Sequence, residues 1–327
     1  MTPLRILAAA TAIELCFAVA AAAVVGLWGA MGGWSDMVNC AAPLLLLLAI
    51  TGAVSARLIL KAGLFRTCCV SLALAAALFN VVLVAPDLVS LATASRPTQG
   101  PAYRVVTANL YHDNYIPTHA AAAIIARRAD AVMVQETDGP VMEAVGLIQK
   151  AYPYSTNCPE ANVQILVKTK VLAQGCGLYV PAAGWKTWGK SFAWLRTAGP
   201  AGRPITLAVV HFGRPYPLQQ QAMERRALSE ALRHFAPQDE TILAGDFNTA
   251  PYTFAMFVQD RVLAPLRRLT FLQPTFPALL IHQRWDFPLL PIDHIYAGAR
   301  WRAAGVTGFR VNGSDHRGLQ ADLRLAP

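Results

Sequence analysis

The stretch LAGDFNT, residues 243–249, shows how this chain is built. It ends a strand-like run that begins at residue 240, and it passes into a polar loop at Asp246 and Asn248. A short apolar run that stops at turn-forming residues is typical of a buried strand. Loops that follow such strands often carry binding and catalytic groups. We therefore expect Asp246 and Asn248 to lie at a strand end, within a functional site.

The same pattern recurs on both sides of this stretch. Strand-like runs cover 103–111, 130–137, 163–171, 191–197, 205–213, 240–249, 293–298, 301–311 and 319–325, and helical patterns cover 118–128 and 217–235. This alternation predicts an α+β or layered α/β domain. The polar residues at or just after the strand-like runs are Asn109, Glu136, His211, Asp246, Asn248, Asp293, Asp315 and His316. Any one of them is more often a turn former or a solvated side chain. Their joint pattern is what indicates function.

These residue types together suit the hydrolysis of a phosphate ester. Glu136, with Asn109 and Asp315, offers the oxygen ligands that a hard cation such as Mg²⁺ (or Mn²⁺) prefers. Such a cation neutralises charge on phosphoryl oxygens. Asp246 is the candidate general base for an attacking water, with Asn248 fixing the geometry. The sequence thus predicts a metal-assisted attack of water on phosphorus.

The pentavalent state also needs hydrogen-bond donors near its oxygens, and His211, Asn248 and His316 can serve this role. Asp315 and His316 are adjacent and point to opposite sides of an extended chain. Asp293 is therefore the better partner to orient the His316 ring. We expect seven of these residues to converge on one cleft, which requires a fold that aligns several strand ends along one edge. They are Asn109, Glu136, His211, Asp246, Asn248, Asp293 and His316.

Six blocks of the sequence resemble, in order, the motifs of the endonuclease/exonuclease/phosphatase superfamily. They are VVTANLY (105–111), VMVQET (132–137), VVHFGRP (209–215), LAGDFNT (243–249), PIDHIYAG (291–298) and GSDHRGL (313–319). The resemblance covers roughly residues 100–327. It implies a four-layered α/β sandwich, with two mostly antiparallel sheets between helices, and a divalent-metal-dependent phosphoesterase.

The resemblance also implies a role for each matching residue. It assigns metal binding to Glu136 and Asn109 with Asp315 near the metal, phosphate contact to His211 and Asn248, water activation to Asp246, and orientation of the final His316 to Asp293. The segment NCPEANVQILVK (157–168) departs from the Gly-rich style of many relatives, and Tyr111 stands where abasic-site endonucleases carry an acid. A DNA-repair activity is disfavoured on this ground.

The substrate is therefore open between a nucleic acid and a phospholipid. We favour a nuclease or general phosphodiesterase. The alternatives are a lipid head-group phosphodiesterase, a phosphatase and a non-catalytic membrane-tethered binding domain. No protein partner and no organic cofactor is indicated by the sequence.

The first third of the chain has a different composition. Hydrophobic residues make up 55% of the 327 residues and charged residues 14%, and apolar runs at 6–28, 38–56 and 68–86 concentrate this excess. Each run is long enough to cross a bilayer as a helix. A cleavable signal peptide would explain only the first of them. We predict a transmembrane module of about three helices at 1–95, a linker at 96–102 and the catalytic domain at 103–327.

Orientation follows from the positive charges, which favour the cytoplasmic side. Arg5 precedes the first span, and Arg57, Lys61 and Arg66 lie between the second and the third. Three crossings then place residue 97 onward outside the cytoplasm, as in a bacterial inner-membrane protein with a periplasmic domain. Loss of the third span would reverse this placement.

The remaining residues, 97–327, carry a net charge of +7 from 23 basic and 16 acidic residues. This charge suits a phosphate-bearing substrate or an anionic membrane surface. The same part of the chain contains Cys158 and Cys176, which bracket the predicted strand 163–171 and its return. In an oxidising compartment these two cysteines can form a disulfide across the start of a hairpin.

Overall fold

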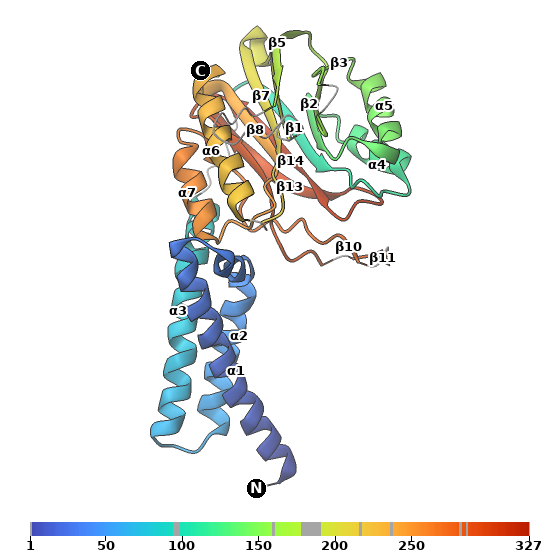
Figure 1. Ribbon diagram of the computed structural model, residues 1–327. Helices are drawn as coiled ribbons and strands as arrows, with labels where there is room; N and C mark the ends of the chain where they lie inside the picture. The colour runs from blue at the N-terminus through green and yellow to red at the C-terminus, as the bar shows by residue number, and fades with distance from the viewer. Residues whose placement is uncertain are drawn as a thin grey trace. The chain divides into compact units, whose positions relative to one another are not determined.

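Three long apolar helices form the N-terminal part of the chain. In the computed structural model they are α1 (Pro3–Trp28), α2 (Ala42–Ile59) and α3 (Leu64–Thr93), and each is long and apolar enough to cross a membrane (Figure 1). The short 3-10 helices η1 (Gly29–Met31) and η2 (Trp34–Ala41) connect α1 to α2. The structure describes residues 2–93, 99–158, 161–177, 191–215, 218–235, 238–280, 283–285 and 287–326.

Small side chains lie where these three helices meet. The buried cluster between them includes Cys16 of α1, Ala49 of α2 and Ala73 of α3. Long apolar side chains lie on the outside, so that Leu58 is 78% exposed and Leu64 is 81% exposed. Small residues at the contacts let helix backbones approach closely, as they do in lipid. This distribution is compatible with a membrane-anchoring bundle.

The chain divides into two compact units, Met1–Ala92 with Ala250–Phe257 and Thr93–Thr249 with Val258–Pro327. In the first unit, the buried Asp36 accepts hydrogen bonds from the backbone N of Phe254 at 3.0 Å and of Ala255 at 2.9 Å. These N–H groups open helix α7 (Phe254–Val262), where a carboxylate satisfies donors that the helix leaves unpaired. The sequence had suggested that this short segment belongs with the catalytic domain.

Two six-stranded sheets form the second unit. Their strand orders are β13-β14-β1-β2-β4-β3 and β5-β6-β7-β8-β12-β9, and β10 pairs with β11 in a separate hairpin. The strands are β1 (Ala102–Asn109), β2 (Ala131–Gln135), β3 (Tyr154–Ser155), β4 (Val163–Val167), β5 (Val171–Cys176), β6 (Phe192–Ala198), β7 (Pro204–His211), β8 (Thr241–Asp246), β9 (Arg267–Arg268), β10 (Leu279–Leu280), β11 (Gln283–Arg284), β12 (Asp293–Ala297), β13 (Trp301–Arg310) and β14 (Arg317–Leu325). Within the sheets, β1 and β2 are parallel, as are β7 and β8, and the other neighbours are antiparallel.

Apolar side chains from both sheets form the core between them. Met133 of the first sheet and Leu207 of the second belong to one buried cluster. On the outer face of the first sheet, Ile124 and Ile148 pack with Val132 in a second cluster. The helices of this unit are α4 (Pro117–Ile125), α5 (Met142–Ala151) and α6 (Leu218–Phe235), with short 3-10 helices at Gly139–Val141, Pro200–Gly202 and Gln238–Glu240. Figure 1 shows α6 along the second sheet and α4 with α5 along the first, which confirms the four-layered α/β sandwich.

The predicted strand 163–171 is wrong as a single element. It is two strands, since β4 ends at Val167 in the first sheet and β5 begins at Val171 in the second. Apolar patterning does not reveal where a chain leaves one sheet for another. The sequence also missed α5, α7 and the short strands β3, β9, β10 and β11. Of the predicted linker 96–102, residues 96–98 lie outside the described residues, and β1 already begins at Ala102.

Candidate active site

The register of the sheets brings the predicted polar residues to one edge. Within the second sheet, His211 of β7 and Asp293 of β12 both lie opposite Asp246 of β8. In the first sheet, Asn109 is the last residue of β1, and Glu136 directly follows β2, which is parallel to β1. Carboxyl ends of parallel neighbours meet at the same edge, so the topology by itself gathers these groups.

The side chain of Asn109 links the two sheets. Its Nδ2 donates hydrogen bonds to Glu136 Oε1 at 3.0 Å and to Asp246 Oδ2 at 3.2 Å. Its Oδ1 accepts a hydrogen bond from the backbone N of Tyr111 at 2.9 Å. In this arrangement Asn109 orients two carboxylates, and its oxygen is already engaged by the backbone.

Two site residues have left-handed backbone conformations. The φ angle is 55° at Glu136 and 49° at Asn248, which is uncommon for residues other than glycine. Glu136 Oε2 accepts a hydrogen bond from the backbone N of His112 at 2.6 Å. Asn248 N donates to Asp246 Oδ1 at 2.7 Å, and its Nδ2 donates to Phe212 O at 2.8 Å. Such conformations concentrate at functional sites, where the surroundings hold them in place.

Asp246 lies between two imidazole rings. The Nε2 atoms of His211 and His316 are each 3.7 Å from its Oδ2. The other ring nitrogen of His316, Nδ1, donates to Asp293 Oδ2 at 2.8 Å. His211 Nε2 is also 3.8 Å from Glu136 Oε1. Asp293 thus fixes the His316 ring so that its Nε2 faces the centre of the site.

Burial and charge shift the pKa values of this cluster. Burial raises the pKa of Asp246 to about 6, with Asp293 adding to the rise and His316 opposing it. Burial alone would lower the pKa of His316, but the carboxylates of Asp293 and Asp246 outweigh it and raise the pKa to about 10. His316 therefore carries a proton at neutral pH and can donate it in a hydrogen bond. A carboxylate with a pKa near 6 is suited to accept a proton at neutral pH.

The donor set fits a divalent cation bound by oxygen. Asp315 Oδ1 and Asp293 Oδ1 are buried and have no hydrogen-bond partner among the described residues. Burial raises the pKa of Asp315, and the nearby Glu136 adds to the rise. A crowded set of acids is the environment that a hard cation neutralises. Donor atoms of Asp246, Asp293 and His316 also lie within 4.8 Å of one another. We assign that trio to proton handling, because Nδ1 of His316 is committed to Asp293.

Gln221 of helix α6, which the sequence analysis did not single out, holds the loops that follow β7 and β8. The buried Gln221 donates from Nε2 to Gly213 O at 2.9 Å and to Phe247 O at 3.1 Å. Its Oε1 accepts the hydroxyl of Thr249 at 3.0 Å. The sequence did carry a signal for the burial of Gln221, because this residue lies on the same face of the amphipathic helix as the buried Leu228.

A second unpredicted contact comes from Ser314 in the GSDH block. Its Oγ donates to Asn109 O at 2.8 Å and accepts the backbone N of His316 at 3.0 Å. A serine that bonds the backbone two residues onward is a common turn device, so the block itself carried this information. Ser314 thereby ties the loop of Asp315 and His316 to the end of β1.

Away from this cleft, Cys158 and Cys176 form a disulfide with their Cα atoms 5.7 Å apart. The bridge joins the segment before β4 to the last residue of β5.

Six of the eight predicted site residues, all except Asn248 and Asp315, contact one another through carboxylate, imidazole or amide atoms. Asn248 reaches Asp246 through its backbone N, and Asp315 Oδ1 lies 3.9 Å from His316 Nε2.

Comparison with known proteins agrees with this geometry. Residues 106–316 match the model of the Endonuclease/Exonuclease/phosphatase family. Similar solved structures include an endonuclease/exonuclease/phosphatase from Beutenbergia cavernae, with 16% identity over 69% of this chain and 72% of that chain and a TM-score of 0.53. Sphingomyelinase C from Streptomyces griseocarneus has 15% identity over 68% and 99% of the two chains, with a TM-score of 0.52. A beta toxin variant from Staphylococcus aureus with bound magnesium ions has 14% identity over 69% and 99%, with a TM-score of 0.50. At these identities the likeness is one of fold. No curated protein matched the chain.

Proposed function

The chain belongs to the endonuclease/exonuclease/phosphatase family, and on this premise we propose that it is a membrane-anchored, divalent-metal-dependent phosphoesterase that hydrolyses phosphodiester bonds. The observation that carries the proposal is the double hydrogen bond of Asn109, which joins Glu136 to Asp246 across the two sheets. These two hydrogen bonds place Glu136, which is suited to binding a cation, and Asp246, which is suited to accepting a proton, in one site.

The reaction follows from the positions of the side chains. Water attacks phosphorus opposite the leaving oxygen, so a new P–O bond forms while the ester P–O bond breaks. Asp246 takes the proton of the attacking water, and its pKa of about 6 suits this role. His211, Asn248 and the protonated His316 supply donors for the phosphoryl oxygens as charge develops there. A Mg²⁺ or Mn²⁺ ion held by Glu136 and Asp315 would neutralise part of that charge.

The full-length protein in detergent, supplied with Mg²⁺, should hydrolyse bis-p-nitrophenyl phosphate to p-nitrophenyl phosphate and nitrophenolate. The same preparation should be offered plasmid DNA, RNA, sphingomyelin vesicles and the monoester p-nitrophenyl phosphate, with product release as the readout. Cleavage of a diester supports the proposal. Hydrolysis of the monoester alone would identify a phosphatase, and no hydrolysis of any substrate would indicate a binding domain instead.

A lipid head-group phosphodiesterase is the second candidate for one specific reason. The apolar bundle α1–α3 exposes long side chains such as Leu58 and Leu64, and a tether to the bilayer would keep the enzyme beside a lipid substrate. The similar fold of a sphingomyelinase C is consistent with this candidate. The vesicle arm of the same experiment separates it from a nuclease.

We further propose that the sandwich lies outside the cytoplasm, at the bacterial inner membrane. The exposed Arg57 lies in the last turn of α2, and the exposed Lys61 lies between α2 and α3. Such residues favour the cytoplasmic side. Three spans would then carry the sandwich across the membrane. The disulfide between Cys158 and Cys176 supports an oxidising location.

Reporter fusions should distinguish the two possible placements of the sandwich. Alkaline phosphatase, which is active only outside the cytoplasm, should be active when fused after Pro327 and inactive when fused after Lys61. Three crossings, with positive charge kept inside, account for this expectation. An inactive fusion after Pro327, together with an active one after Lys61, would contradict the proposed orientation.

A further inference from the structure

One buried histidine next to the active site has no part in the reaction as described so far. His294 directly follows Asp293 on β12, and it is 0% exposed. Its Nε2 lies 3.0 Å from Thr249 O, and its Nδ1 lies 3.1 Å from Thr270 Oγ1. Both nitrogens of the His294 ring are therefore engaged in hydrogen bonds.

The surroundings of His294 determine which nitrogen carries the proton. Burial lowers the pKa of His294 to about 3, and the charge of Arg268 adds to the fall, so the ring is neutral at neutral pH. A neutral imidazole has one donor nitrogen and one acceptor nitrogen. Because Thr249 O can only accept, Nε2 is the donor, and Nδ1 accepts the hydroxyl of Thr270. His294 thus donates a hydrogen bond to the backbone of the loop that follows β8.

Buried side chains hold the carbonyl groups on both sides of Asn248. Gln221 Nε2 donates to Phe247 O at 3.1 Å, just before Asn248. His294 Nε2 donates to Thr249 O, just after Asn248. Asn248 itself has a φ of 49°, a conformation that a residue other than glycine keeps only where the surroundings hold it. The bonds from Gln221 and His294 supply that support.

The conformation of Asn248 decides where its hydrogen-bond donors lie. Its backbone N donates to Asp246 Oδ1 at 2.7 Å, and its Nδ2 donates to Phe212 O at 2.8 Å. A side-chain amide has two N–H donors, so one of them remains for a phosphoryl oxygen. Misplacing such a group by about 1 Å can cost about 10²-fold in rate. Support of the backbone around Asn248 therefore matters for turnover.

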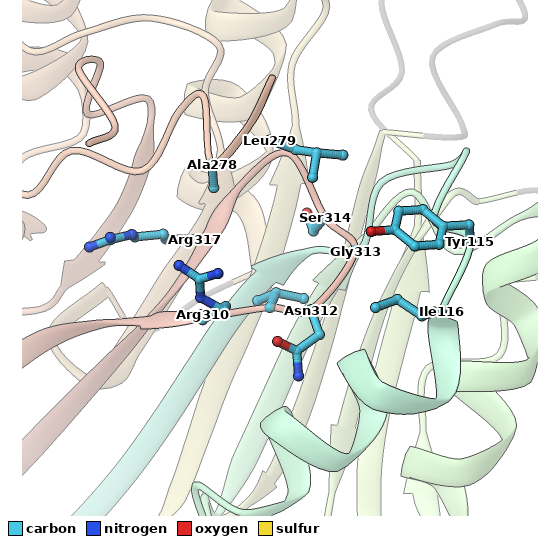
Figure 2. Close-up of a pocket in the computed structure, with 10 residues that line it drawn as sticks. Tyr115, Ile116, Ala278, Leu279, Arg310, Asn312, Gly313, Ser314 and Arg317 are labelled. Carbon is cyan, nitrogen blue, oxygen red and sulfur yellow. The ribbon is translucent and has the colours of Figure 1, made fainter. Parts of the chain in front are cut away.

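His294 itself is out of reach of a substrate. Its side chain is fully buried and points to the face of the sheet opposite that of Asp293, since successive residues of a strand alternate. Figure 2 shows a pocket of about 290 Å³ that is lined by Tyr115, Ile116 and the turn between β13 and β14. His294 is not among the residues that line it. An effect of His294 on catalysis must pass through the residues that it holds.

We propose that His294 is a positioning residue, which acts through Thr249 O to keep Asn248 in place for contact with the phosphoryl group. The inference rests on the proposed phosphodiesterase function and adds a residue to it. Two neighbouring residues of β12 then support the site in different ways. Asp293 orients the ring of His316, whereas His294 holds the loop of Asn248.

Two variants of His294 test this role in the full-length protein with Mg²⁺ and bis-p-nitrophenyl phosphate. His294→Phe keeps a ring but removes the donor, so kcat should fall by about 10- to 100-fold. KM should change less, because the donor of Asn248 acts on charge that develops in the transition state. His294→Gln can still donate to Thr249 O and should retain most of the kcat. Equal losses in the two variants, or a folded His294→Phe protein with unchanged kcat, would overturn the inference.

A matched control separates positioning from a general loss of stability. Thr197 is also 0% exposed, and its hydroxyl donates to Lys170 O at 2.9 Å. It pairs with the start of β7, whereas His211 ends that strand. Thr197→Val should lower the melting temperature and leave kcat unchanged. If Thr197→Val lowers kcat as much as His294→Phe does, the inference is overturned.

A double variant tests whether the effect passes through Asn248. Once Asn248→Ala has removed the side chain, His294→Phe should lower kcat much less than it does alone. Independent effects, in which the two losses of kcat multiply in full, would contradict the proposed connection.

The proton on Nε2 can be observed in the unmodified protein. Nitrogen NMR spectra of the protein labelled at histidine should show a neutral His294 ring that is protonated at Nε2. A charged ring, or a proton on Nδ1, would overturn the inference even if His294→Phe fails to fold. Absence of diester hydrolysis by the unmodified protein would instead refute the proposed function, and the positioning role with it.

Discussion

Replacing Asp246 by Asn should lower kcat for a diester by about 10²–10⁴-fold, the usual contribution of a general base. The amide of Asn cannot take the proton of the attacking water, although it is nearly the same size as the carboxylate. The carboxyl of Asp246 is 1% exposed and lies 3.7 Å from both His211 and His316, at the centre of the cluster. The check is the initial rate of nitrophenolate release from bis-p-nitrophenyl phosphate.

The matched control for this variant lies at the other end of the same strand. Asp239 is exposed and precedes β8, whereas Asp246 ends it. Asp239→Asn should keep the full rate. Because Asp246 accepts hydrogen bonds from Asn109 and Asn248, the thermal unfolding of both variants must also be measured. A folded Asp246→Asn protein with more than a tenth of the normal kcat would contradict the role of Asp246 as the base.

Removing the divalent cation should abolish turnover altogether. Glu136, Asp246, Asp293 and Asp315 form a cluster of acids in which two buried carboxylate oxygens have no hydrogen-bond partner among the described residues. Without a cation, these carboxylates would repel an anionic phosphodiester. Excess EDTA should therefore reduce the rate to the background, whereas EGTA, which prefers Ca²⁺ to Mg²⁺, should leave it largely intact. Equal rates in EDTA and in Mg²⁺ would contradict a metal-dependent mechanism.

The sequence predicted the parts of the site that depend on local pattern. LAGDFNT stops an apolar strand at Asp246, and the same rule found Asn109 and His211 at the ends of β1 and β7. Strand ends can be recognised in the sequence because the apolar run stops where polar residues begin. Their convergence is also expected, since parallel neighbours bring their carboxyl ends to one edge of a sheet. The three apolar helices could be predicted from the length and composition of the apolar runs alone.

Contacts between distant segments could not be predicted in this way. The amide of Asn109 bonds to Asp246 across 137 positions of sequence, and no local pattern encodes which atom faces which. The same holds for Asp36, which caps a helix 218 residues further on. The bond from His294 to Thr249 O depends on the register of β12 against β8, which a shift of one residue would change. These features follow from tertiary packing, which single-sequence patterns do not specify.

The most direct test of a metal-dependent phosphodiesterase is one series of three rates on a single sample. Nitrophenolate release from bis-p-nitrophenyl phosphate by the full-length protein is measured in Mg²⁺, then in excess EDTA, and finally after Mg²⁺ is added beyond the chelator. We expect a measurable rate, its loss to the background and its recovery. A rate that is unchanged by EDTA, or the absence of hydrolysis in Mg²⁺ and Mn²⁺ by the folded protein, would contradict the proposed site.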